Sequence, residues 1–151
     1  LTLLNLQNNG LSGSFPLVTS LSALEFLRFQ NNSKSSSPTI IGDVPIVSGC
    51  PLLNTLDIAD NDLSGYQEAP WPNVDFRNLQ VQGNNLTSTA VNNILSAVEA
   101  TGLSANNFGG GGDPTRTLNL GGSNAQPTNG RGNTFFNKLT ARGWTINYPG
   151  S

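Results

Sequence analysis

A string of eleven residues recurs along the chain, and it constrains the fold more than any other feature. It carries apolar side chains at its first, fourth, sixth and eleventh positions and an asparagine at its ninth. Complete copies lie at 1–11, 53–63 and 76–86. The copy at 24–34 ends on Lys34 in place of an apolar residue, and a weaker copy at 115–125 has Ser123 where the asparagine belongs. A string that returns in this way indicates an architecture of similar, stacked units.

The fourth and sixth positions of the string place two apolar side chains on one face of a short strand, because side chains alternate along a strand. One such strand cannot bury its apolar face alone, so successive copies are expected to lie side by side in a parallel sheet. At 53–63 the string has the form L-x-x-L-x-I-x-x-N-x-L, which is the leucine-rich repeat signature. We therefore predict an α/β solenoid of right-handed turns, with a short parallel β-sheet on the concave face and loops and short helices on the convex face.

The asparagine at the ninth position has a separate task. After each strand the chain bends, and backbone groups there lose their partners in the sheet. An inward-pointing amide can satisfy those groups in one turn after another. The residues predicted to form this structural ladder are Asn9, Asn32, Asn61 and Asn84.

One repeat unit is longer than its neighbours. Leu27 to Leu56 spans 29 residues, whereas Leu56 to Leu79 spans 23. The additional residues fall in 33–51, which is rich in Ser, Pro and Gly and contains one apolar pair at 40–41. Such a segment predicts a loop outside the stack. Whether the loop is inert or binds a partner stays open.

The C-terminal half contains helical segments and a closing strand. Residues 87–102 form an amphipathic pattern with apolar side chains at i, i+3, i+4 and i+7. A second helix is predicted at 134–143, and the alternating residues 144–148 predict a last strand that covers the final unit. We expect a single domain over 1–151, of about five to six turns, with its cap at 134–151. Because the chain begins directly with a repeat and has no polar cap before it, an apolar edge would be exposed, and we also expect the chain to be part of a longer protein.

Composition excludes several function classes. With a net charge of −2, 11% charged residues and no basic run, the chain is not expected to bind nucleic acid. No apolar run reaches the roughly 18 residues of a membrane span, so no membrane insertion is expected. Without histidine, catalysis through Ser–His or Cys–His pairs is excluded within this chain, and Cys50 is expected to be packed. A carboxylate pair for glycoside chemistry is the remaining catalytic alternative, and the repeat places no such pair. We predict no catalytic residue, no metal site and no cofactor.

Strand residues that alternate with the core leucines face the open side of the predicted sheet. One row is expected to contain Asn5, Arg28, Asp57, Gln80, Asn119 and Thr145. The next should contain Gln7, Gln30, Ala59, Gln82, Gly121 and Asn147, and a third Leu3, Phe26, Thr55, Asn78 and Thr117. The candidate binding residues on this concave face are Asn5, Gln7, Phe26, Arg28, Gln30, Asp57, Gln80, Gln82 and Asn119. Such a polar, nearly neutral surface suits a glycan or a protein epitope. The amides could equally solvate an exposed sheet and stack as ladders.

The chain resembles a known group over its last part. The runs 86–95, 117–127 and 139–146 are similar to the C-terminal module of leucine-rich repeat proteins from bacteriophages and bacteria. That resemblance implies a non-enzymatic structural or attachment component of the phage virion. Its partners would be other virion proteins or a protein or glycan of the host surface, and it could form a homo-oligomer. The Leu-Ser-Gly runs at 11–13 and 63–65 resemble plant-type repeats and imply the alternative, an extracellular or cell-surface binding domain of receptor type.

Overall fold

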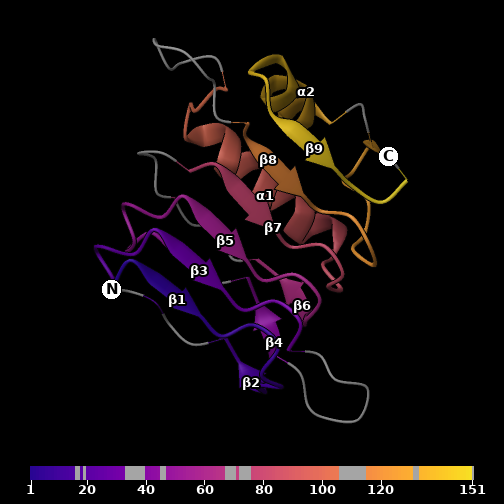
Figure 1. The fold of residues 1–151 in the computed structure, drawn as a ribbon. Helices are drawn as coiled ribbons and strands as arrows, with labels where there is room; N and C mark the ends of the chain where they lie inside the picture. The colour runs from indigo at the N-terminus through magenta and orange to yellow at the C-terminus, as the bar shows by residue number, and fades with distance from the viewer. Residues whose placement is uncertain are drawn as a thin grey trace.

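The computed structural model describes residues 1–15, 18, 20–32, 40–44, 47–66, 71, 76–105, 115–130 and 133–150. Within these ranges the chain has an α/β fold, with two parallel sheets and few helices. The larger sheet has six strands in the order β1-β3-β5-β7-β8-β9, and each strand lies beside the next one in this series (Figure 1). Its strands are β1 (Leu3–Asn5), β3 (Phe26–Arg28), β5 (Thr55–Asp57), β7 (Asn78–Gln80), β8 (Thr117–Asn119) and β9 (Thr145–Asn147).

The middle residues of these strands are aligned across the whole sheet. Neighbouring strands pair in parallel without a slip, which brings the central apolar side chains into one row. That row consists of Leu4, Leu27, Leu56, Leu79, Leu118 and Ile146. The four inner leucines are fully buried, so the predicted parallel sheet with its aliphatic inner face is confirmed.

The predicted helix at 87–102 is confirmed as α1 (Ser88–Ala100), which lies behind β7 and β8 (Figure 1). Its N-terminus is capped by the Thr87 hydroxyl, which accepts a hydrogen bond from the Ala90 backbone N–H. Gly102 follows its C-terminus at φ +71°, a conformation that glycine adopts without strain. The side chains of Val91, Ile94, Leu95 and Val98 are buried against the sheet, as the pattern predicts.

The second predicted helix is α2 (Thr134–Ala141), and it packs on α1. Asn133 caps it, since its side-chain oxygen accepts from the N–H groups of Phe135 and Phe136. Trp144 and Tyr148, which flank β9, are buried as the prediction of a covering strand requires.

A second parallel sheet corrects the prediction for 33–51. Its strands are β2 (Gly13–Ser14), β4 (Ile40–Asp43) and β6 (Asp62–Gly65), in the order β2-β4-β6. The apolar pair at 40–41 was predicted in a loop outside the stack, but it forms part of β4. Ile40 is only 2% exposed and belongs to the core together with Val44 and Val47, because their burial draws this segment inward. Residues 33–39 and 45–46 lie outside the described part of the chain.

The asparagine ladder is present at three of the four predicted positions. Asn32, Asn61 and Asn84 are buried, and each amide nitrogen donates to a carbonyl of its own turn and to one of the turn before. The oxygen of Asn84 accepts from the Leu63 N–H. The buried oxygen of Asn61 has no partner within the described residues. Residue 34, at the last position of the preceding copy of the string, lies outside them.

Asn9 does not belong to the inner ladder, contrary to the prediction. It is exposed, and among the described residues its amide nitrogen donates only to the carbonyl of Gln7. An inner asparagine also bonds the turn on its upstream side, and for residue 9 that side holds none of the described strands. The oxygen of Asn32 instead accepts from the N–H groups of Asn9 and Leu11.

In the last copy of the string, the ladder position is occupied by Asn124. The spacing of the string had placed Ser123 there. The amide nitrogen of Asn124 donates to the carbonyls of Val81 and Leu120, and its oxygen accepts from the Leu86 N–H. The carbonyl of its own turn lies four residues before it, whereas the corresponding carbonyl lies three residues before Asn61. One additional residue in this turn therefore explains the apparent departure from the repeat.

Candidate binding surface

The open face of the six-stranded sheet is the face opposite α1. Its first row, at the starts of the strands, consists of Leu3, Phe26, Thr55, Asn78, Thr117 and Thr145. Its second row, at the ends of the strands, consists of Asn5, Arg28, Asp57, Gln80, Asn119 and Asn147. Beyond the strands follow Gln7, Gln30, Ala59, Gln82 and Gly121. The structure therefore gathers all nine candidate binding residues on or beside this face.

The prediction placed the residues of β9 two positions out of register. Thr145 was expected beside Asn119 but pairs with Thr117, and Asn147 takes the place beside Asn119. Ile146 lies opposite Leu118, while Trp144 turns inward and its indole N–H donates to the carbonyl of Leu103. A slip of two residues leaves every side chain on the same face, so alternation alone could not reveal it.

Three side chains of the second row accept hydrogen bonds from backbone N–H groups that follow closely in the sequence. The side-chain oxygens of Asn5, Asp57 and Asn119 each accept from the N–H two residues ahead, at 3.2, 3.3 and 3.2 Å. These bonds close the same local turn at the ends of β1, β5 and β8. The shared contact is one that Asn and Asp provide and that longer side chains reach less easily. For these three residues, part of the hydrogen-bonding capacity is structural.

Amides of the open face also bond one another. Gln80 donates to Asn78 at 2.6 Å and accepts from Asn119 at 3.2 Å. Gln30 donates to Gln7 at 2.5 Å. The predicted amide ladders therefore form in part. Asn78 was absent from the candidate binding residues, although the alternation along β7 places it beside Gln80.

Arg28 and Asp57 are the only charged residues in the two strand rows. They are register partners on neighbouring strands, but no ion pair joins them within the part of the chain that the structure describes. Both are half-buried. Desolvation raises the pKa of the Asp57 carboxyl; the Ala59 N–H and the charge of Arg28 act in the opposite direction, while Asp60 adds to the rise. The two charges thus influence each other across the strands without contact.

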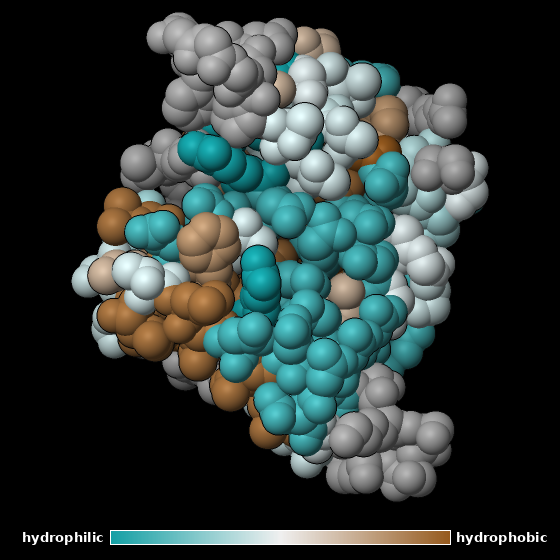
Figure 2. Space-filling model, viewed as in Figure 1, coloured by the Kyte–Doolittle hydropathy of each residue, from teal (hydrophilic) through white to brown (hydrophobic). Residues whose placement is uncertain are grey.

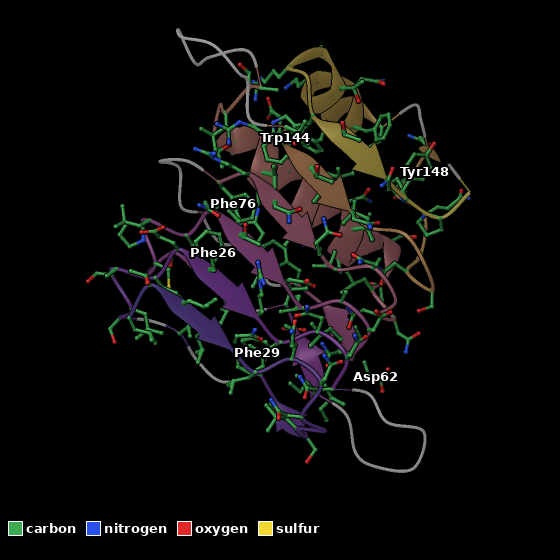
Figure 3. The ribbon with its side chains drawn as sticks, in the orientation of Figure 1. Phe26, Phe29, Asp62, Phe76, Trp144 and Tyr148 are labelled. Atoms are coloured by element: carbon green, nitrogen blue, oxygen red, sulfur yellow. The ribbon has the colours of Figure 1, made fainter. Side chains whose placement is uncertain are left out.

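The polar surface adjoins an apolar one. Figure 2 shows hydrophilic side chains over the middle of this face and a hydrophobic area over β1. Leu3, 46% exposed, contributes to that area, and Phe26 lies near the start of β3 (Figure 3). Leu3 and Phe26 are register partners in the first row, and together they form an apolar corner of the open face. Arg28 lies two residues after Phe26 on β3, so the second row begins directly beside this corner.

The remaining candidates for chemistry are placed as follows. Cys50 is buried, its thiol donates to the carbonyl of Val18 at 3.4 Å, and burial raises its pKa. Within the described ranges, no group of three or more Cys, Asp or Glu side chains is arranged to hold a metal ion. The helices found there are all too short or too polar to cross a membrane.

Comparison of the chain with protein-family models, with curated proteins and with solved structures found no match. Assignment of a function therefore rests on the repeat pattern, on the resemblance of the C-terminal half and on the chemistry of the open face.

Proposed function

We propose that this chain is a leucine-rich repeat solenoid that serves as a non-enzymatic attachment or structural component of a phage virion. Its open face is the recognition or assembly surface. The observation that carries the proposal is the unslipped register of six parallel strands, which gathers side chains from residues 3 to 147 on one face. Six strands thus contribute to a single surface, as expected of a solenoid that binds along its sheet.

The chemistry of the face favours binding over catalysis. It offers amides, hydroxyls, one charge pair and one exposed apolar corner. Groups of this kind recognise a polar partner through many hydrogen bonds, with an apolar anchor for orientation. The ladder bonds among Gln80, Asn78 and Asn119 hold several of these amides in fixed orientations before a ligand arrives. Fixed donors and acceptors lose less conformational entropy when they bind.

The assignment to a phage particle is supported by the resemblance over residues 76–151. One structural observation favours the alternative, an extracellular recognition domain of receptor type. The two Leu-Ser-Gly runs at 11–13 and 63–65, which resemble plant-type repeats, both reach strands of the second sheet, β2 and β6. A signal peptide and a cysteine-containing cap in the full-length sequence would support that alternative, whereas assembly segments would support the virion.

Binding to bacterial cells and to a glycan array tests the proposal. The purified chain is compared with a variant in which Arg28, Gln30, Gln80 and Gln82 are all changed to Ala. A control variant carries Asn137→Ala, Lys138→Ala and Thr140→Ala, which removes the same net charge from the exposed side of α2. We expect the first variant alone to lose binding.

Two outcomes would contradict the proposal. Equal binding by both variants would remove the open face from recognition. The virion assignment has its own test, mass spectrometry of purified phage particles from the source, and it is wrong if the chain is missing from them.

A further inference from the structure

The charge pair of the open face carries an inference about the ligand. Arg28 and Asp57 lie side by side in register, yet no ion pair or hydrogen bond joins them within the described residues. The Arg28 guanidinium makes no hydrogen bond there at all. One carboxylate oxygen of Asp57 accepts from the Ala59 N–H at 3.3 Å, which leaves the other oxygen for a further donor. The N–H groups of the Arg28 guanidinium and one carboxylate oxygen of Asp57 therefore lie on neighbouring strands, and both side chains are on the open face.

The positions of these groups restrict what can satisfy them together. Neighbouring strands of a sheet lie about 4.8 Å apart. A group that bridges them must accept from the guanidinium and donate to the carboxylate over a comparable span. Two adjacent hydroxyls do this, because each hydroxyl is both a donor and an acceptor. Bonds to a charged partner are also stronger than those between neutral groups.

The net charge of the pair further narrows the ligand. Arg28 and Asp57 sum to zero, and no other charged residue lies in the two strand rows. An anionic ligand that binds Arg28 would bring its charge close to the Asp57 carboxylate, and a cationic one would face Arg28. A neutral ligand meets neither repulsion.

Phe26 adds an aromatic surface beside the two charged groups. It precedes Arg28 by two residues, so both side chains lie on the same face of β3. Its ring is half-buried and continues the exposed apolar corner at Leu3. An aromatic surface beside hydrogen-bonding groups fits a ligand with one apolar face and a hydroxylated edge, as a pyranose ring has.

We propose that Arg28, Asp57 and Phe26 form a subsite for a neutral sugar unit with vicinal hydroxyls, presented by a cell-surface polysaccharide. One hydroxyl accepts from Arg28, the adjacent one donates to Asp57, and the ring lies against Phe26. This inference rests on the proposed function and specifies the class of ligand that the open face recognises. A protein epitope is the competing outcome of the test.

The test uses immobilised mannan, dextran and galactan as neutral probes and polygalacturonate as the anionic probe. Each neutral polysaccharide is also offered after periodate oxidation and borohydride reduction, which cleaves vicinal diols and leaves the polymer otherwise neutral. The intact chain should bind at least one neutral polysaccharide and lose that binding after oxidation. Arg28→Gln and Asp57→Asn should each weaken it at least about tenfold, as expected for loss of a charged hydrogen bond.

The matched controls are Lys138→Gln and Asp62→Asn, exposed charges outside the open face, which should bind as the original chain does. Thermal melts of all four variants show whether a loss of binding reflects a loss of folding, and Phe26→Leu tests the ring in a variant that keeps an apolar side chain.

The inference is wrong if binding survives oxidation, if Arg28→Gln and Asp57→Asn bind normally, or if only polygalacturonate binds. Cell binding without binding to any polysaccharide would also overturn it but would leave the proposed function intact. Absence of both would overturn the inference and the attachment role, and would leave only the structural role of the proposed function.

Discussion

The side-chain oxygen of Asn84 accepts the backbone N–H of Leu63, 21 residues earlier, at 3.0 Å. The amide nitrogen of Asn84 donates to the carbonyls of Ile58 and Val81 at 3.1 and 2.9 Å. One buried side chain thus joins the turn after β7 to the turn after β5. Because Asn32 and Asn124 make corresponding contacts, these bonds hold successive turns at a fixed spacing and so keep the open face in register.

Asn84→Leu should therefore lower the free energy of unfolding by about 3 kcal/mol or more. It leaves the Leu63 N–H buried without its partner, and it adds a branched apolar group at a fully buried position. The carbonyls of Ile58 and Val81 each lose one donor but keep their bonds to Asn61 and Asn124. Chemical denaturation followed by circular dichroism measures this loss. The matched substitution is Gln80→Ala on the open face, which should change stability by no more than about 0.5 kcal/mol. Equal losses would mean that the inward and outward assignments are wrong.

Gly122→Ala should cost more than a left-handed backbone alone explains. Gly122 has φ +72°, and a Cβ atom there would lie 2.6 Å from the backbone nitrogen of Gly83, which cannot rotate away. Gly102 has nearly the same φ, +71°, but open space around its missing Cβ. We expect Gly102→Ala to cost about 1 kcal/mol and Gly122→Ala at least about 1 kcal/mol more. Thermal melts of the two variants isolate the close approach between turns, and similar losses would contradict it.

Much of the larger sheet could be predicted because one pattern is repeated. The apolar pair two residues apart determines which side chains of each strand are buried, and the common spacing brings Leu56 and Leu79 into register. The same logic failed at β9, where Trp144, Ile146 and Tyr148 alternate and each could have matched Leu118. That choice depends on packing, since the Trp144 indole finds its partner at Leu103.

The second sheet and the true ladder residue of the last turn had weaker signals in the sequence. The strands β2 and β6 consist largely of Gly, Ser and Asp, which are poor strand formers, so their pairing depends on the position of β4 between them. A local signal does mark each turn, however. Asn31, Asp60 and Gly83 precede their ladder asparagines and adopt positive φ, which these residue types tolerate best. Gly122 continues the series two residues before Asn124 and reveals the additional residue.

The Cys50 thiol should not react in the folded protein. It is fully buried, and desolvation raises its pKa, so the reactive thiolate is rarely present. A colorimetric thiol reagent such as Ellman's reagent should therefore modify almost none of it in native buffer and all of it in concentrated guanidinium chloride. Rapid modification without denaturant would show that the core around Val18 and Leu53 opens on the time scale of the assay.

Asp57→Asn should stabilise the fold at neutral pH, by less than about 1 kcal/mol because the group is half-exposed and screened. The pKa of the Asp57 carboxyl is raised above 3.8 in the folded chain, mainly by desolvation, so its charged form is disfavoured by folding. The penalty is fully present above the folded pKa and disappears as the pH falls below 3.8, where the carboxyl is protonated in both states. The stability advantage of Asp57→Asn should thus shrink to nothing on acidification, while the asparagine oxygen still accepts from the Ala59 N–H.

Urea unfolding of both proteins across this pH range measures the stability difference, with Asp62→Asn as the control for removing one negative charge. A constant difference between wild type and Asp57→Asn at every pH would show that burial of the Asp57 charge is not its cause.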